Sequence, residues 1–206
     1  MNSEPNLIRK DNAKEQKKQS PLATAFEYLE LLAWAIFAVM MLFTFVFRLC
    51  RVDGNSMENS FANGENLLIW SIGYTPEQDD VVVFHLPEKE GERTLVKRVI
   101  ATGGQNVTIN FQTKEILVDG VRYEDSHAVL KSFSDEFIGR YTLFAEHNYD
   151  SDQKIFSATV PDGHVFVMGD NRNNSKDSRD LDIGFVDERC VLGRAIVRVF
   201  PFTIYP

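Results

Sequence analysis

Apolar residues are distributed unevenly along this chain of 206 residues. The first twenty residues are polar and charged and have little to bury, which predicts a disordered tail. An apolar run follows at 31–47, with no charge and a single hydroxyl group, that of Thr44. A core helix of a soluble domain would show a polar face, and this run shows none. With its flanks it is long enough to cross a bilayer, so we expect a transmembrane helix at 31–49.

A cleavable signal peptide is the alternative, but no small-x-small cleavage pattern follows Phe47. We therefore expect an uncleaved signal anchor in the cell membrane. Five basic residues precede the run, and only Arg48 and Arg51 follow it closely. This asymmetry predicts a single-pass protein with residues 1–30 in the cytoplasm and an extracytoplasmic domain at 50–206.

After Arg51 the pattern changes to short β-branched and aromatic runs separated by Gly, Asp, Asn and Pro, which is typical of strands. Strands are expected at 81–84, 94–101, 107–111, 116–123, 165–168 and 195–202. Asp119-Gly120 predicts a two-residue hairpin turn. The stretch 126–159 is more polar and irregular, which indicates a small inserted lobe within about 106–160. The predicted fold class is mainly β, an all-β domain preceded by one transmembrane helix.

Charge and composition exclude some functions. The formal net charge is -8, and from Val52 onward 15 basic and 25 acidic residues give about -10. Phosphate binding needs basic surfaces, so a nucleic-acid partner is not expected. The four histidines have no metal-ligand spacing, and neither a metal nor a cofactor is expected. Cys50 ends the apolar run, so a bridge to Cys190 is not favoured, although the state of both thiols stays open.

Candidate chemistry begins with Gly54-Asn55-Ser56-Met57, which places a hydroxyl close to the end of the anchor. Such a segment alone is more often only a turn. Serine becomes a nucleophile when a base removes its proton, and no histidine lies in a motif that also holds Asp and Ser. Strand alternation places Lys97 on one face with Leu95 and Val99. Apolar burial lowers the pKa of a lysine and makes its amine a base, whereas the alternative is a strand lysine whose head reaches water.

A third polar segment, 169–179, follows the expected strand 165–168. Its Asp and Arg residues alternate at spacings that allow internal ion pairs, and its hydroxyls could bond an amine. Alone it could equally be an Asx-rich surface loop.

Together and in this order, segments 54–57, 96–100 and 169–179 resemble the serine, lysine and Gly-Asp-Asn-Arg boxes of bacterial type I signal peptidases. Residues 61–69 and 80–84 resemble two further boxes, and the similarity covers most of 47–202 outside the lobe. The single anchor and Gly54 resemble the Gram-positive form. The resemblance implies a signal-peptidase-like catalytic domain and a membrane-bound serine endopeptidase. Such an enzyme removes signal peptides from secreted preproteins after small residues (Ala-x-Ala), without a cofactor.

The resemblance also implies a role for each site residue. Ser56 would attack the scissile carbonyl, its backbone N–H would donate to the oxyanion, and Lys97 would be the general base. Gly54 stands where some members carry a serine that assists the oxyanion. Ser175 would orient the Lys97 amine. The ion pairs Arg98–Asp170 and Asp177–Arg179 would support the site. Departures from the pattern affect local turn geometry and leave the two catalytic positions in place: Asn59 for proline, Thr102-Gly103 for Leu-Pro, and Gln105 and Asn173 for Asp.

Two rival functions are compatible with parts of the same pattern. An inactive membrane-tethered binding module would be favoured had Ser56 or Lys97 been replaced, and both are present. A self-cleaving repressor uses similar chemistry but needs a DNA-binding domain where this chain has an anchor.

Secretory preproteins and membrane lipid are the expected partners, and the protein is expected to be a monomer. Trp70, Ile72 and Tyr74 either dip into the outer leaflet or belong to a core strand. The sequence does not indicate which preproteins are preferred or what the lobe does.

Overall fold

The structure is a computed structural model that describes residues 20–88, 91–124, 126–128, 149–150, 152–199 and 203–204. The predicted disordered tail falls largely on residues 1–19, which lie outside the described residues. The chain divides into two compact units, Met1–Met41 and Leu42–Pro206. The elements are α1 (Pro21–Phe45), β1 (Phe47–Arg51), β2 (Asn66–Trp70), β3 (Val81–Glu88), β4 (Gly91–Thr102), β5 (Asn106–Asn110), β6 (Glu115–Val118), β7 (Val121–Arg122), β8 (Tyr149–Asp150), β9 (Ile155–Thr159), β10 (His164–Met168), β11 (Val186–Asp187), the 3-10 helix η1 (Glu188–Cys190), β12 (Val191–Arg198) and β13 (Thr203–Ile204).

Helix α1 contains the apolar run. It begins at Pro21 because proline suits the first helical position, and the Ser20 hydroxyl accepts the Ala23 N–H at 3.2 Å. None of its residues is buried, and it is long and apolar enough to cross a membrane. The helix starts ten residues before the predicted span and ends at Phe45, and β1 begins at Phe47. The membrane boundaries 31–49 themselves stay a prediction.

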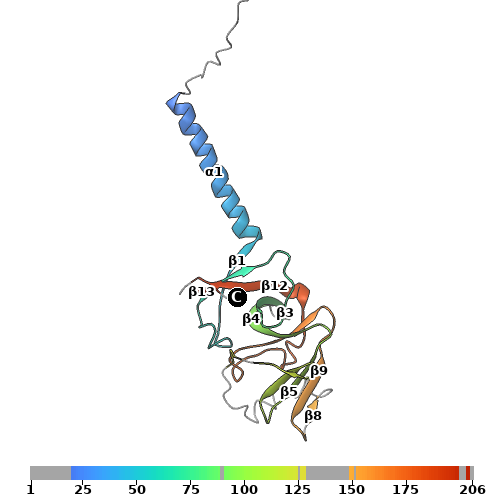
Figure 1. Ribbon diagram of the computed structural model, residues 1–206. Helices are drawn as coiled ribbons and strands as arrows, with labels where there is room; N and C mark the ends of the chain where they lie inside the picture. The colour runs from blue at the N-terminus through green and yellow to red at the C-terminus, as the bar shows by residue number, and fades with distance from the viewer. Residues whose placement is uncertain are drawn as a thin grey trace, which may run out of the picture. The chain divides into compact units, whose positions relative to one another are not determined.

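The main sheet joins strands from both ends of the domain. Its order is β1-β2-β12-β3-β4-β10-β11, with β13 pairing β12, and every paired register is antiparallel. Strand β4 lies between β3 and β10, so Lys97 is in the interior of the sheet (Figure 1). Strand β10 ends at Met168 and delivers segment 169–179 directly beside β4.

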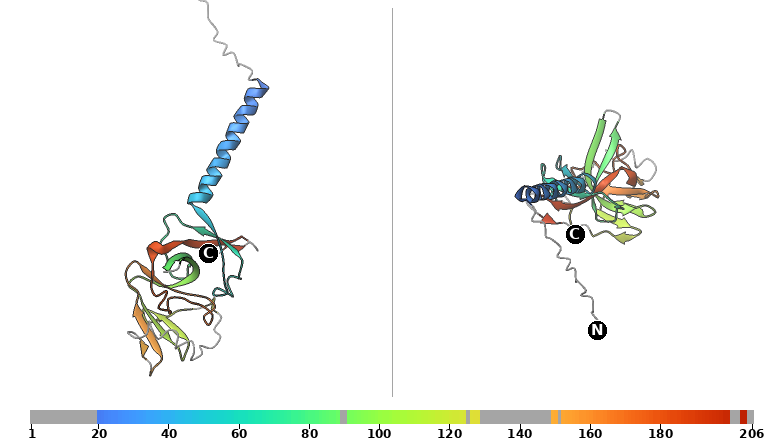
Figure 2. Two further views of the ribbon diagram at one scale, coloured as in Figure 1. Left: turned by 180° about the vertical axis from the view of Figure 1, so that it is seen from behind. Right: turned by 90° about the horizontal axis from the view of Figure 1, so that it is seen from above.

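A second sheet, in the order β7-β6-β5-β9-β8, lies within the range 106–160 for which a lobe is predicted. It lies at the end of its unit opposite to β1 (Figures 1 and 2). Asp119 and Gly120 have φ of 53° and 77°, the two positive values that a tight hairpin turn of this kind requires. Strand β9 was not expected, because its alternation is short and lies within a polar stretch. Lobe residues 125, 129–148 and 151 lie outside the described residues.

Three clusters of buried side chains hold the strands together. One joins the second sheet to the main sheet through Ile100, Phe166 and Met168. A second packs Met57 and Phe61, just after the candidate nucleophile, against strands β2, β3 and β4. The third contains Val82 and Val99 and extends to Leu95. The predicted class, mainly β after one apolar helix, is confirmed.

Candidate active site

Ser56 lies in the connection between β1 and β2. Hydrogen bonds from Val52 N to Glu65 O and from Gly64 N to Val52 O, both 2.8 Å, close the base of this loop. Gly54 has φ of 90°, a conformation that favours glycine, and its N–H donates to Asn63 Oδ1 at 3.0 Å. Met57 is fully buried beneath the turn, whereas Ser56 is half-buried. The loop therefore presents the serine hydroxyl at a surface while a core residue anchors it.

The Ser56 hydroxyl meets the lysine amine. Lys97 Nζ lies 2.7 Å from Ser56 Oγ and donates to the carbonyl oxygen of Val96 at 2.9 Å. The lysine is only 2% exposed, and its cross-strand neighbour is Val82. Val82, Leu95 and Val99 belong to one apolar cluster, in agreement with the alternation along β4. An amine with so little hydration is a poor site for a positive charge, and such an amine can take a proton from a hydroxyl.

The segment after β10 holds the backbone of the nucleophile turn. The Asn171 N–H donates to the carbonyl oxygen of Ser56 at 3.0 Å, and the Asn171 amide group donates to Asn55 O at 3.1 Å. Gly169 approaches so closely that a Cβ there would lie 2.4 Å from Ser56 O and 2.3 Å from Ser175 Oγ. Only glycine fits at this contact. The sequence showed Gly169 in a polar box but gave no reason for its lack of a side chain.

Two buried ion pairs surround this contact. Arg98 binds Asp170 through both Nε (2.9 Å) and Nη2 (2.8 Å), and Arg179 binds Asp177 at 2.7 and 2.8 Å. All four residues are at most 5% exposed. Burial by itself lowers the pKa of Arg98, but the hydrogen bonds and charge of Asp170 outweigh it and raise that pKa. Burial raises the pKa of Asp177, but Arg179 outweighs it and lowers that pKa.

Ser175 lies between the second ion pair and Gly169. It is 7% exposed, and its hydroxyl is a hydrogen-bond partner of Asp177, which helps to lower the pKa of that carboxyl group. The Gly169 N–H also donates to Asp177, at 3.0 Å. The structure thus brings Ser175 into the site, whereas its role in orienting the Lys97 amine stays a prediction.

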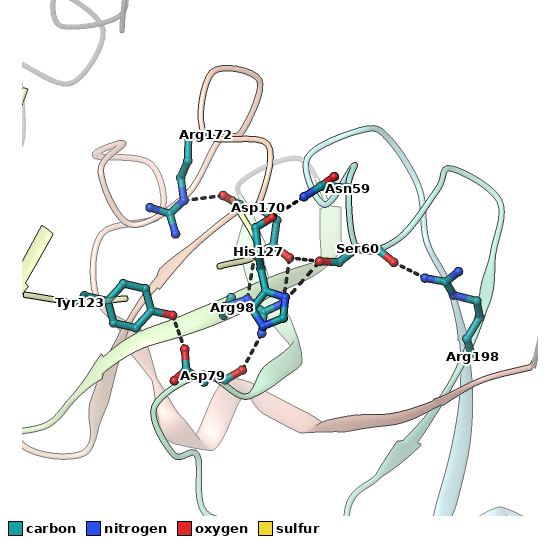
Figure 3. Close-up of polar contacts among 10 residues, drawn as sticks. Asn59, Ser60, Asp79, Arg98, Tyr123, His127, Asp170, Arg172 and Arg198 are labelled. Carbon is teal, nitrogen blue, oxygen red and sulfur yellow. Dashed lines mark hydrogen bonds and ion pairs between the residues drawn. The ribbon is translucent and has the colours of Figure 1, made fainter. Parts of the chain in front are cut away.

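Several site residues gave no signal in the sequence (Figure 3). The Ser60 hydroxyl donates to Asp170, and Arg198 from β12 donates to the Ser60 carbonyl oxygen. Arg172 is fully buried, and its Nε donates to Gly169 O at 3.0 Å. Ser60 and Arg198 are 138 positions apart, and local patterns carry no information on such a contact. Arg172 belongs to the polar box, and only the resemblance could have selected it.

The stretch predicted as either interfacial or core is divided between the two. Trp70 is 39% and Ile72 51% exposed. Tyr74 packs against the cluster that contains Val82, and its hydroxyl donates to Asp80 at 2.7 Å. Burial and this hydrogen bond raise the pKa of Tyr74 well above its usual range. Trp70 and Ile72 are thus exposed, and Tyr74 is partly buried against the core.

The described residues contain no group of three or more His, Cys, Asp or Glu side chains that could hold a metal ion. Cys50 and Cys190 are both free thiols, and burial raises the pKa of Cys50.

A hydroxyl hydrogen-bonded to a buried amine on a β scaffold resembles the nucleophile and base of a serine hydrolase. Comparison with known proteins defines the class further. The family model described as signal peptidase, peptidase S26, matches residues 25–200. The chain therefore belongs to the signal peptidase family S26, whose members are serine endopeptidases.

Relatives within the family match over most of their length. A protein of Synechocystis sp. named probable signal peptidase I-1 is 30% identical, over 89% of each chain. Signal peptidase IB of Staphylococcus aureus (strain Mu50) is 30% identical, over 84% of this chain and 92% of its own. A solved signal peptidase I from Enterococcus faecalis V583 aligns with 59% of this chain and 97% of its own, at 26% identity and a TM-score of 0.38.

Proposed function

We propose that this chain is a membrane-anchored signal peptidase I in which Ser56 is the nucleophile and Lys97 is the general base. The observation that carries the proposal is the 2.7 Å contact between Ser56 Oγ and Lys97 Nζ. Because Lys97 is 2% exposed, the neutral amine is favoured over the ammonium group. Its lone pair then accepts the Ser56 proton while Ser56 Oγ attacks the scissile carbonyl.

Attack creates a negatively charged oxygen that needs a donor. Among the described residues no acceptor takes the Ser56 N–H, so it is available to the oxyanion. The hydrogen bond from Asn171 N to Ser56 O fixes the adjacent peptide group. Gly54 adds no side-chain donor, and a serine there would have to adopt a φ of 90°.

The same amine serves both halves of the reaction. Protonated Lys97 gives its proton to the leaving amine as the scissile C–N bond breaks, which leaves an ester on Ser56. A water molecule then loses a proton to Lys97 and attacks the ester. The bond between the acyl carbon and Ser56 Oγ breaks, Lys97 returns the proton to Ser56 Oγ, and the signal peptide leaves with a new carboxyl group. Ser175 is proposed to orient the amine, and the pairs Arg98–Asp170 and Asp177–Arg179 brace the backbone on either side.

The proposed substrate is an extended segment of a secretory preprotein that ends in small residues, as Ala-x-Ala does. An extended segment can add to a strand edge through main-chain hydrogen bonds, with alternate side chains in pockets. The apolar helix fits a membrane anchor. We place its N-terminal side in the cytoplasm, from the basic residues before it, and the catalytic domain outside as a monomer.

Membrane lipid is the second proposed partner. Leu49 is 66% exposed and pairs with Leu68, and Phe47 pairs with Trp70 in the same β1–β2 ladder. Phe47, Leu49, Leu68, Trp70 and Ile72 form the proposed apolar face. Such a face is suited to the interfacial region of a bilayer.

The experiment compares cleavage of a preprotein by the detergent-solubilised protein, by three variants of the catalytic pair and by one control variant. Ser56→Ala and Lys97→Ala should abolish turnover, and Lys97→Arg should not restore it, because guanidinium stays protonated. Lys114→Arg, in the turn between β5 and β6 of the second sheet, is the control and should cleave normally. Turnover by Ser56→Ala, or a normal rate with Lys97→Arg, would contradict the assignment. A wild-type protein that binds the preprotein without cleaving it would support the inactive binding module.

A further inference from the structure

Two hydrogen bonds connect the segment after β7, within the lobe, to residues near the catalytic pair (Figure 3). One runs from Asn59 to His127, and the other from Tyr123 to Asp79. Asn59 lies three positions after Ser56, and Asp79 contacts Arg98, the neighbour of Lys97. Each catalytic residue therefore lies near one contact with the lobe.

Asn59 is the position at which the nucleophile turn departs from the family pattern. Its φ is 104°, which proline cannot adopt because its ring holds φ near -65°. The Asn59 side-chain amide donates to the carbonyl oxygen of His127 at 2.8 Å. This Asn59–His127 hydrogen bond offsets part of the cost of the positive φ at Asn59. It also attaches the turn between Ser56 and Ser60 to the lobe.

Tyr123 forms the second connection. Its ring is 8% exposed within the cluster that joins the two sheets, and its N–H donates to Ile116 O at 2.8 Å. The Tyr123 hydroxyl donates to the Asp79 carboxylate. Asp79 has φ of 73°, and its carbonyl oxygen accepts Arg98 Nη1 at 2.8 Å. The Tyr123 hydroxyl thus anchors the side chain of Asp79, a residue with positive φ. The backbone carbonyl of Asp79 in turn orients Arg98.

We propose that Asn59 and Tyr123 are positioning residues through which the lobe holds Ser56 and Lys97 within hydrogen-bond reach. The inference rests on the proposed Ser56/Lys97 function and extends it to the lobe. Arg98 is bound on three sides, by Asp170, by Asp79 O and by Ser60. Removing the Tyr123 hydroxyl takes away the side-chain anchor of Asp79, whose N–H stays bonded to Val99 O at 2.9 Å, and removing the Asn59 amide takes away one of the contacts that hold the turn. Both changes loosen the 2.7 Å contact between Ser56 Oγ and Lys97 Nζ, and they leave the reacting groups themselves unchanged.

The experiment uses the full-length protein in detergent with a preprotein substrate. Tyr123→Phe removes one hydroxyl. Asn59→Asp keeps the shape but cannot donate, and Asn59→Gly removes the amide while suiting the positive φ. Thr108→Val is the matched control, because it removes a hydroxyl whose hydrogen bonds, to Ser157 and to Asn106 at 3.1 Å each, stay within the second sheet. For each variant kcat, KM, the pH midpoint of kcat and the melting temperature are measured.

The proposal predicts that Tyr123→Phe, Asn59→Asp and Asn59→Gly lower kcat by about three- to tenfold, the factor that one hydrogen bond supplies. KM should change less than twofold, and the pH midpoint should shift with Tyr123→Phe because Arg98 is next to Lys97. Asn59→Gly should lower kcat without lowering the melting temperature, which a purely structural role would not produce. Thr108→Val should keep its kcat.

Normal kcat and a normal pH midpoint in both Tyr123→Phe and Asn59→Gly would overturn the proposal. If only one of the two variants has a normal kcat, the proposal is overturned for that residue. These failures are distinguishable from failure of the proposed function, because they leave the loss of activity in Ser56→Ala unchanged. If Tyr123→Phe does not fold, the two Asn59 variants test the proposal alone.

Discussion

Gly169→Ala is expected to impair catalysis although residue 169 carries no reactive group. The added Cβ would lie 2.4 Å from the carbonyl oxygen of Ser56 and 2.3 Å from Ser175 Oγ. An ordinary carbon–oxygen contact is roughly 1 Å longer, since non-bonded atoms pack at about 3.5 Å. The backbone at Ser56 or the strand end after Met168 must therefore move by a substantial part of an ångström.

The size of the effect follows from that displacement. Overpacking of this kind costs about 1–3 kcal/mol of unfolding free energy. A shift of about 1 Å in a reacting group can reduce kcat about 100-fold. The contact at risk is that between Ser56 Oγ and Lys97 Nζ, at 2.7 Å. The assay is kcat for preprotein cleavage, measured well below the melting temperature of the variant, so that only folded protein is compared.

Gly103→Ala is the matched control. Its Cβ would also be crowded, 3.1 Å from Pro161 O, Asp162 Cα and Gly163 N, but at the junction of the two sheets. It should lower the melting temperature and leave kcat of the folded protein near the wild-type value. A Gly169→Ala variant with wild-type kcat would refute the argument that this close approach sets the position of Ser56.

Three further predictions concern charge, lipid and topology. Asp177→Asn should lower the free energy of unfolding by about 3–5 kcal/mol at neutral pH, because it leaves Arg179 buried without its partner. The folded-state pKa of Asp177 is lowered, so its stabilisation is present above its unfolded-state pKa and is lost as pH falls below about 4. Denaturant unfolding should therefore show a weaker acid dependence in the variant, whereas Asp182→Asn, in an exposed pair, should behave as wild type. Trp70→Ser combined with Ile72→Ser should reduce liposome binding of the anchor-free domain without changing its melting temperature; a large fall in melting temperature would show that these side chains are core. Protease added to intact spheroplasts should digest the domain after Arg51, and its protection would reverse the proposed orientation.

Local patterns predicted the elements that have a clear period. The β-branched runs correctly predicted β3, β4, β5 and β10, and Asp119-Gly120 correctly predicted a hairpin turn. Strand β1 was not expected, because Phe47 continues the apolar run and only its pairing with β2 makes it a strand. The pairing of distant strands, such as β12 with both β2 and β3, leaves no local pattern.

The candidate site was predictable where residues lie in motifs and unpredictable where the fold brings lone residues together. Ser56, Lys97 and the acid–arginine pairs were named from their boxes, and the structure pairs Ser56 with Lys97, Arg98 with Asp170 and Arg179 with Asp177. Ser60, Tyr123 and Arg198 lie outside every box that was given a role. Their hydrogen bonds exist only because the β1–β2 loop, the second sheet and β12 meet around Arg98 and Asp170.

The most direct test of the central claim is to titrate the Lys97 amine itself. Lysine labelled at Cε and Nζ can be followed by NMR across the working pH range, with the Lys97 signal assigned by its absence in Lys97→Arg. The account predicts a neutral amine at the pH of full activity, and protonation on acidification with the same midpoint as the loss of kcat. An amine that stays protonated throughout the active pH range would contradict the role of Lys97 as the base that activates Ser56.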